Sequence, residues 1–173
     1  MKKKAKPVEA SKTIMTELVM PNDTNPLGHL MGGNLMRWMD IAASICAARH
    51  CESTVVTASV DLVSFDYPIK LGEVVTLVAT VTRAFNTSVE INVQVYASKF
   101  EGGDMFKRNS AFFTFVALDA KHRKRKVPPV HPITDEEIRL YEGALRRRQI
   151  RLISAGKMDP KDATEVKEFI NKT

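Results

Sequence analysis

One predicted helix, at about residues 33–50, is apolar around its whole circumference. Its apolar side chains do not gather in a single stripe; they are Leu35, Met36, Trp38, Met39, Ile41, Ala42, Ala43 and Ile45. A helix at the surface of a globular protein keeps a polar face, so this pattern is typical of a helix that is buried on all sides. The rest of the chain must therefore supply elements that surround it.

The surrounding elements are predicted to be β-strands. One strand-like run precedes the helix, at residues 13–20, and four follow it, at residues 55–65, 74–85, 89–100 and 106–118. Their β-branched and aromatic residues and partial alternation indicate an antiparallel sheet with one covered face. Turn-forming residues separate the four runs. The pattern predicts an α+β fold in which a meander of four strands wraps one long helix.

The remaining residues are predicted to add two parts to this domain. Residues 1–12 are predicted to be a flexible basic N-terminus, and residues 13–130 to be the α+β domain. Residues 131–173 are predicted to be a helical extension. Its first helix begins at Thr134 with a capping box closed by Glu137, and its second begins at Asp159 and Pro160. We expect these helices to pack on the domain or on a neighbouring subunit.

Composition limits the class of protein. The chain has 173 residues, of which 44% are hydrophobic, and this suits one core. It contains no apolar run of membrane-spanning length and no signal-peptide core, so we expect a cytoplasmic protein without membrane insertion. Two cysteines, Cys46 and Cys51, are too few for a disulfide framework and are expected to be reduced.

The net charge of +6 favours anionic partners. Basic residues concentrate near the N-terminus, at residues 121–126 and at residues 146–151. They are either solvated ends or a rim that attracts a polyphosphate ligand. The run at 121–126 has no interleaved aromatic residues for base stacking, so we expect no specific nucleic-acid partner.

Motifs exclude several common kinds of site. The sequence has no GxSxG elbow, no P-loop, no GxGxxG after a strand, and no CxxC or HxxxH pair. The four histidines show no ligand spacing, so no metal is expected. His29, in the turn before the long helix, either lines a site or is a surface residue.

The turn before the long helix is the candidate site. Turn formers occupy residues 21–28, and Gly32 and Gly33 open the helix, where the first backbone N–H groups lack partners. Glycine lets a ligand oxygen come close to such groups. Asn25 is either a turn residue bonded to its own backbone or an amide that holds a carbonyl or orients water. Asp40 lies about 10 Å along the helix from Gly33.

Asp40 also has two interpretations. With Arg37 and Ser44 it falls within a narrow arc of the helix, so it could belong to an exposed polar stripe with an ion pair to Arg37. It could instead face a cleft and act as a general base or as a nucleophile on an activated carbonyl. A hydrolase of activated acyl groups needs oxyanion donors on one side of the carbonyl and such a carboxylate on the other. The 10 Å separation is too long within one chain, whereas two copies could share a site.

Three segments carry a family resemblance. They are DTNPLGHLMGGNLMRWMD, VVTASVDLVSFDYPIKLGEVV, and SAFFTFVALD with the following KVPPV. They resemble the acyl-CoA thioesterases of the hotdog fold, which include the YciA-type bacterial hydrolases and the cytosolic acyl-CoA hydrolases. The resemblance covers about residues 13–129. It implies a long helix wrapped by a curved antiparallel sheet of five to six strands, and a homodimer whose sheets join, commonly with three dimers in a hexamer.

The resemblance also implies the reaction and its residues. Acyl-CoA would be hydrolysed to free fatty acid and CoA, a reaction of fatty acid metabolism, with no cofactor because coenzyme A is part of the substrate. The family's asparagine falls on Asn25 and its aspartate on Asp40, each supplied by a different subunit. We expect the Gly33 N–H and Asn25 to polarise the carbonyl while Asp40 activates water or attacks directly.

Further substrate contacts are expected from a wider set of polar residues and glycines. The phosphates of CoA need cationic and N–H donors. The candidates are Gly32, His29, Thr57, Ser59, Arg83, Asn86, Thr87, Ser88 and Arg108, for each of which turn chemistry or sheet solvation is the alternative. The alternative function is a hotdog module that senses acyl-CoA and regulates transcription, but the residues before Thr13 are too few for a helix-turn-helix.

Overall fold

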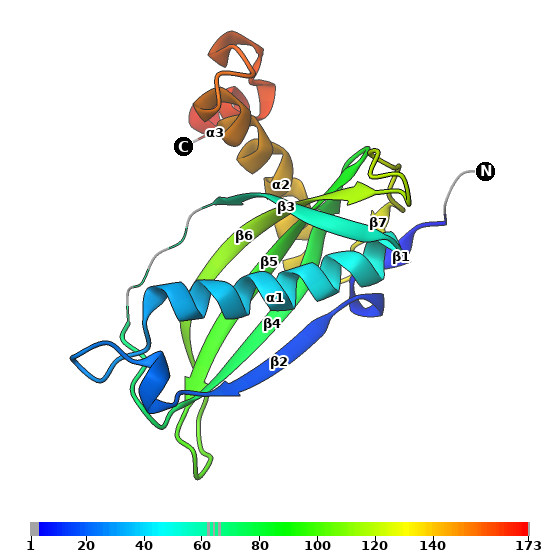
Figure 1. The fold of residues 1–173 in the computed structure, drawn as a ribbon. Helices are drawn as coiled ribbons and strands as arrows, with labels where there is room; N and C mark the ends of the chain where they lie inside the picture. The colour runs from blue at the N-terminus through cyan, green and yellow to red at the C-terminus, as the bar shows by residue number, and fades with distance from the viewer. Residues whose placement is uncertain (1–3, 62, 64, 66, 173) are drawn as a thin grey trace. The chain divides into compact units, whose positions relative to one another are not determined.

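The long helix predicted from the sequence forms as α1 (Gly32–Cys51) and lies along one face of a curved antiparallel sheet (Figure 1). In the computed structural model, residues 4–61, 63, 65 and 67–172 are described. The chain divides into two compact units, Met1–His131 and Pro132–Thr173. The sheet and α1 belong to the first unit, and they confirm the predicted α+β class.

Five strands form this sheet in the order β2-β4-β5-β6-β3. They are β2 (Thr13–Leu18), β3 (Thr54–Asp61), β4 (Val74–Ala84), β5 (Ser88–Ser98) and β6 (Phe106–Leu118). Strands β4, β5 and β6 follow one another through short turns, as the sequence predicted. The predicted meander is wrong at its first strand, because β3 pairs with β6 and not with β4. The twelve residues between β3 and β4 are too long for a hairpin, and β3 lies at one edge of the sheet.

The core lies between α1 and the sheet. Alternate residues of β4 and β5 point toward the helix and are fully buried, for example Leu77, Ile91 and Val93. From α1, Trp38 and Met39 are buried against them. Each large side chain of this kind contributes about 1.5–3 kcal/mol when it is fully buried. Burial of alternate positions explains why the sheet has one covered face.

The prediction that α1 is buried on all sides is wrong. Arg37, Ile45 and Arg49, which lie eight and four residues apart, are exposed, and Asp40 and Ile41 are half-buried. The sheet covers one broad side of the helix, so a stripe along the other side stays open to solvent in one chain. This stripe contains Asp40, and Ile45 is 37% exposed within it.

Residues from Lys6 onward form structure within the segment that was predicted to be flexible. Strand β1 (Lys6–Pro7) pairs in parallel with β7 (Val130–His131). The Nζ atom of Lys6 donates to the backbone oxygen of His50 at 3.0 Å and pairs with Glu52 at 2.6 Å, both at the end of α1. A cation is favourable there because the helix carries partial negative charge at its C-terminus.

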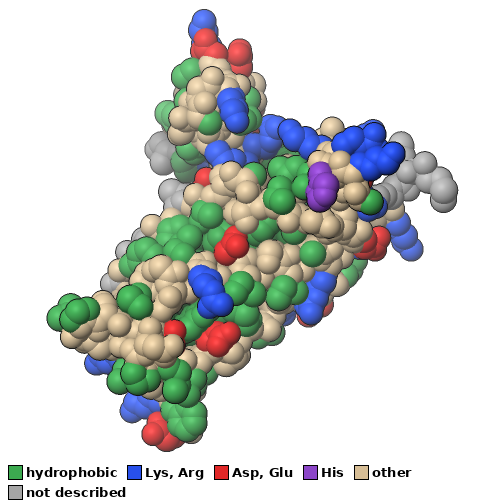
Figure 2. All heavy atoms as spheres, viewed as in Figure 1, with side chains coloured by type: hydrophobic (Ala, Val, Ile, Leu, Met, Phe, Trp, Pro, Cys, Tyr) green, Lys and Arg blue, Asp and Glu red, His purple; other side chains and the backbone are tan. Residues whose placement is uncertain are grey.

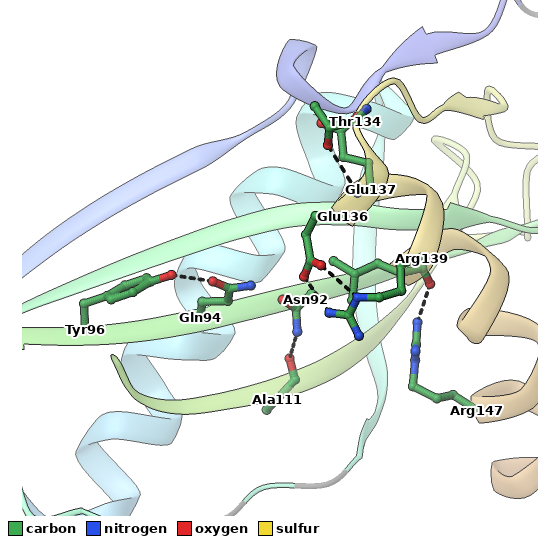
Figure 3. A network of polar contacts seen from close by, with 10 residues as sticks. Asn92, Gln94, Tyr96, Ala111, Thr134, Glu136, Glu137, Arg139 and Arg147 are labelled. Atoms are coloured by element: carbon green, nitrogen blue, oxygen red, sulfur yellow. Dashed lines mark hydrogen bonds and ion pairs between the residues drawn. The ribbon is translucent and has the colours of Figure 1, made fainter. Parts of the chain in front are cut away.

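The second unit contains α2 (Asp135–Ser154), a 3-10 turn (Pro160–Asp162) and α3 (Thr164–Lys172). The predicted capping box is confirmed: the Thr134 hydroxyl accepts the N–H of Glu137, and the Glu137 carboxylate accepts the backbone N–H of Thr134 (Figure 3). The second helix begins at Thr164 and not at Asp159. Asp159 instead caps the 3-10 turn, because its side chain accepts the N–H of Lys161.

No helix in the part of the chain that the structure describes is long and apolar enough to cross a membrane. Within the same residues, no group of three or more histidines, cysteines, aspartates or glutamates is placed to hold a metal ion. Cys46 and Cys51 are free thiols, as predicted, and both are buried. Burial raises the pKa of the Cys46 thiol to about 12.

Candidate active site

The side chain of Asn25 organises the turn that leads into α1. Its Oδ1 atom accepts the backbone N–H of Leu27 at 3.0 Å and of His29 at 3.2 Å. Because the oxygen is committed to these two donors, the amide presents its Nδ2 group as the remaining donor. No described residue accepts a hydrogen bond from that group. The turn role and the carbonyl-binding role of Asn25 are therefore compatible.

The start of α1 presents backbone donors. Met31 precedes the helix and makes no side-chain capping bond. No described residue accepts the N–H of Gly33, and a Cβ atom added at Gly33 would meet nothing within 4 Å. An added Cβ at Gly32 would instead lie 3.3 Å from the ring of Phe65. Gly32 thus makes room for an aromatic side chain, while Gly33 leaves open space in front of a helix N-terminus, which favours negative charge.

Asn25, His29 and Gly32 line one cavity of about 340 Å³. The other lining residues are Leu30, Leu35, Phe65, Tyr67, Pro68, Ile69 and Asn109. Apolar and aromatic walls with a few polar groups are typical of small-molecule sites. Phe65, Tyr67 and Asn109 were not predicted from the sequence. An aromatic pair in the loop before a proline could have indicated Phe65 and Tyr67, whereas Asn109 lies among the polar residues at the start of β6 and carries no such signal.

Asp40 lies outside this cavity, two turns further along α1. Its Oδ1 atom accepts a hydrogen bond from the hydroxyl of Thr57 on β3 at 2.8 Å. The ion pair with Arg37 that the sequence allowed is absent among the described residues. The carboxylate is thus held by the edge strand β3 and faces the open stripe of α1.

The other predicted substrate contacts do not converge in one chain. Arg108, at the start of β6, pairs with Glu73 at 3.5 Å, beside the start of β4. Arg83 and the turn at residues 86–88 lie at the other end of β4, roughly 30 Å away along an 11-residue strand. Ser59 is on β3, and its buried hydroxyl has no hydrogen-bond partner among the described residues.

Strand pairing defines two groups of predicted site residues. Thr57 pairs with Phe115, Phe115 with Val89, and Val89 with Ala84, which makes one row of paired residues across β3, β6, β5 and β4. This row lies next to the turn at residues 86–88, which joins β4 to β5. Asp40 and this turn therefore belong to one group. Asn25, His29, Gly32, Gly33 and Arg108 belong to the group at the opposite end of the sheet. Neither group alone brings oxyanion donors and a carboxylate together.

Comparison with known proteins identifies the family. Residues 27–100 match the model of the Thioesterase superfamily. Over 141 residues the chain is 42% identical to a Bacillus subtilis protein named as an uncharacterized acyl-CoA thioester hydrolase, covering 82% of each chain. The chain therefore belongs to the acyl-CoA thioester hydrolases of the thioesterase superfamily, which have the hotdog fold.

Solved structures agree in fold and class. An apo-hexameric acyl-CoA thioesterase superposes with a TM-score of 0.84 at 39% identity, covering 88% of this chain and 97% of that one. An acyl-CoA hydrolase from Staphylococcus aureus, solved with butyryl coenzyme A and coenzyme A, superposes with a TM-score of 0.82 at 35% identity, covering 88% and 95%. Variants of the latter have been solved in which alanine replaces an aspartate, a threonine or an asparagine.

Proposed function

We propose that the protein hydrolyses acyl-CoA to a carboxylic acid and CoA at a site shared by two subunits. One subunit supplies Asn25 and the N-terminus of α1, and the other supplies Asp40. The observation that carries this proposal is the division of the site within one chain. Among the described residues that line the cavity beside Asn25 there is no carboxylate, and Asp40 lies about 10 Å along the helix from Gly33.

The position of Asp40 supports the pairing of subunits. Thr57, which holds the carboxylate, is on β3, the edge strand whose outer side has no described neighbour. Val56 and Val60 on that strand are 45% and 36% exposed. A long exposed edge with apolar side chains is a template for pairing with another strand. A second subunit docked along β3 would cover the open stripe of α1 and bring its Asn25 turn toward Asp40.

The proposed chemistry assigns a role to each group. The N–H of Gly33 and the Nδ2 group of Asn25 donate to the thioester carbonyl oxygen and stabilise the negative charge that develops there. Asp40 of the other subunit takes a proton from water, and the oxygen of that water attacks the carbonyl carbon. The carbon–sulfur bond then breaks, and the CoA thiolate leaves and takes up the proton from Asp40. The hydrogen bond from Thr57 orients the carboxylate.

Residue spacing in a relative supports these three side chains. In the Staphylococcus aureus hydrolase, the substituted aspartate follows the substituted asparagine by 15 positions, and the substituted threonine follows the aspartate by 17. Asp40 follows Asn25 by 15 positions here, and Thr57 follows Asp40 by 17. The same three residue types at the same spacings favour a common site.

Direct attack by Asp40 is the alternative route, through an anhydride between the acyl group and the carboxylate. A single turnover in water labelled with ¹⁸O separates the two routes. In the general-base route the label enters the product acid and never Asp40. In the anhydride route, water that attacks the aspartyl carbon places the label in Asp40, which mass spectrometry of the α1 peptide detects.

We further propose that no cofactor takes part and that the functional assembly is built from such dimers. A hexamer is supported by the hexameric thioesterase to which this chain is similar. Among the remaining predicted contacts, the turn at residues 86–88 and Arg83 share the end of the sheet with Asp40, so we assign them to CoA binding. Arg108 lies at the opposite end, beside the Asn25 half of the site.

The test follows thiol release from butyryl-CoA by the wild type, Asn25→Ala and Asp40→Asn. We expect Asp40→Asn to lose about 10²-fold or more in kcat with its fold intact, because a general base is removed. Arg37→Gln, on the same stripe of α1, is the matched control and should keep near wild-type activity. Hydrolysis by Asp40→Asn at the wild-type rate would refute the assignment. Binding of acyl-CoA without hydrolysis by the wild type would favour the sensor function.

Mixing the two inactive variants tests the shared site. A mixed dimer has one site with both substitutions and one site with neither, so activity should return toward half of the wild-type value per dimer. Subunit exchange is verified independently by mass spectrometry of tagged chains. Exchange without any return of activity would show that Asn25 and Asp40 act within one subunit.

A further inference from the structure

The basic loop at residues 121–126 is an ordered part of the first unit. Asp119 holds it, since its Oδ1 accepts the N–H groups of Lys121 and Arg123 at 2.8 and 2.9 Å. These hydrogen bonds, first the one from Arg123, keep the pKa of Asp119 below its usual value. The N–H of Arg125 donates to Ala117 at 2.9 Å, which fixes the other end of the loop on β6. A charged run with this many backbone contacts is a positioned surface and not a loose tail.

The basic side chains of the loop are of two kinds, those with a partner in the chain and those without a carboxylate partner among the described residues. Arg123 pairs with Asp119 at 3.0 Å, and Arg125 donates to the backbone oxygen of Glu52 at 3.2 Å. The exposed side chains of Lys121, Lys124 and Lys126 have no carboxylate partner among the described residues. Two arginines therefore stabilise the loop, while three lysines remain available to an anion.

The loop lies beside the turn that follows β4. The N–H of Val127 donates to the backbone oxygen of Asn86 at 3.1 Å, and the N–H of Ala117 donates to that of Thr87 at 2.9 Å. The hydroxyl groups of Thr87 and Ser88 and the lysines thus occur together at one end of the sheet. In Figure 2, Lys and Arg side chains gather at the end of the unit where Figure 1 places β1 and β7.

Distances along α1 show which half of the site this loop can serve. Arg125 contacts Glu52, the residue that follows the last residue of α1 and caps the helix. Asp40 is twelve residues before Glu52, or about 18 Å, and Gly33 is nineteen residues before it, or about 28 Å. The pantetheine arm between the sulfur and the diphosphate of CoA has roughly the length of four extended residues, about 15 Å. Together with a lysine side chain that reaches about 6 Å from the backbone, the arm spans roughly 21 Å, so it can join this loop to the Asp40 of the same chain but not to its own Gly33.

We infer that Lys121, Lys124 and Lys126 bind the phosphates of CoA, and that they do so for the site to which their own chain gives Asp40. This inference rests on the proposed function. It makes the subunit that supplies Asp40 also the subunit that holds the nucleotide, while the other subunit supplies the donors for the carbonyl. Positive charges that meet phosphates strengthen binding without changing the chemical step, so they act on KM and not on kcat.

A matched pair of double variants tests the role of the loop. Lys124→Gln with Lys126→Gln removes two charges from it, and Lys99→Gln with Lys107→Gln removes two from the opposite end of the sheet, where these lysines are also exposed. We expect the loop variant to raise the KM for butyryl-CoA about 10-fold, with kcat within about twofold, and the control to leave both unchanged. The KM for S-butyryl-pantetheine, which has no phosphates, should be the same in all three proteins.

Three results would overturn the inference: an unchanged KM for butyryl-CoA in the loop variant, an equal rise in the control, or an equal rise for the pantetheine ester. Calorimetric binding of CoA to the same proteins needs no turnover. It therefore tests phosphate binding by the loop even if the wild-type protein hydrolyses neither thioester. That absence of hydrolysis would refute the proposed function but not the role of the loop. Loss of CoA affinity in the loop variant only is the expected result.

Mixed dimers test which subunit the loop serves. In a mixture of Asn25→Ala and Asp40→Asn chains, the intact site takes Asp40 from the Asn25→Ala chain. Adding the two lysine substitutions to that chain should raise the KM of the restored activity about 10-fold. Adding them to the Asp40→Asn chain should not change it. The reverse result would place the loop beside the carbonyl-binding half and refute the inference.

Discussion

Replacement of Gly33 by alanine separates stability from activity at the start of α1. An added Cβ meets no atom within 4 Å, so the folded chain accepts it without strain. Alanine favours a helix over glycine by about 1 kcal/mol in the interior and less in the first turn, so we expect a gain of about 0.5 kcal/mol. For a unit of this size that is a rise in Tm of about 1–2 °C.

The same methyl group would stand in the space where the thioester carbonyl must approach the Gly33 N–H. A displacement of about 1 Å from the reactive geometry can cost about 10²-fold, so we expect kcat/KM to fall by that order while Tm rises. The assays are calorimetric unfolding and thiol release from butyryl-CoA. Full activity in a stabilised variant would refute the placement of substrate at this helix start, and a lower Tm would refute the open space around Gly33.

Gly32→Ala is the comparison for this prediction. Its Cβ would lie 3.3 Å from the Cζ atom of Phe65, so the ring must shift by a few tenths of an ångström. The helix-propensity gain should then be reduced or lost, and the wall of the cavity should change. Equal increases in Tm for the two glycine variants would contradict this difference in packing.

Three further predictions concern single side chains. Thr57→Val removes the hydrogen bond to Asp40 and should lower kcat about 10-fold, whereas Thr57→Ser should retain it. Burial raises the Cys46 pKa to about 12, so above pH 9 the folded state keeps a proton that the unfolded state loses. The free energy of unfolding should therefore fall between about pH 9 and pH 12, by at most about 1.4 kcal/mol per pH unit. Urea titrations at several pH values should show a weaker pH dependence for Cys46→Ala. Lys6→Met should lower the free energy of unfolding by about 1 kcal/mol in the same assay, because α1 loses a cation at its C-terminus.

Local patterns in the sequence predicted most of the elements. The run Phe106–Leu118 is a strand with the predicted bounds, and Thr134 caps α2 with Glu137 as predicted. These features depend on neighbours a few residues away, so a local pattern contains the needed information. The place of β3 next to β6 depends on contacts between residues more than fifty positions apart, and alternation within β3 does not indicate which strand it joins.

The candidate site was predicted in its residue types but not in its arrangement. Asn25, Gly33 and Asp40 stand out because a turn, a glycine pair and a carboxylate are unusual next to an apolar helix. Phe65 and Asn109 were missed because their positions in the cavity wall result from chain folding between distant segments. Arg83 and Arg108 were both predicted to bind phosphate, although they lie at opposite ends of the sheet.

By itself, the sequence determined the helix and the strands of the main sheet, because periodicity and turn chemistry act over short distances; the pairing of an amide turn with a carboxylate stays a prediction. The sequence also determined the separation of Gly33 from Asp40, because the rise of a helix per residue is constant. Only the tertiary structure decided that β3 is an edge strand holding Asp40 through Thr57, and that an ordered lysine loop lies beside the turn at residues 86–88. Those facts arise from packing between segments far apart in the chain, which no local pattern encodes.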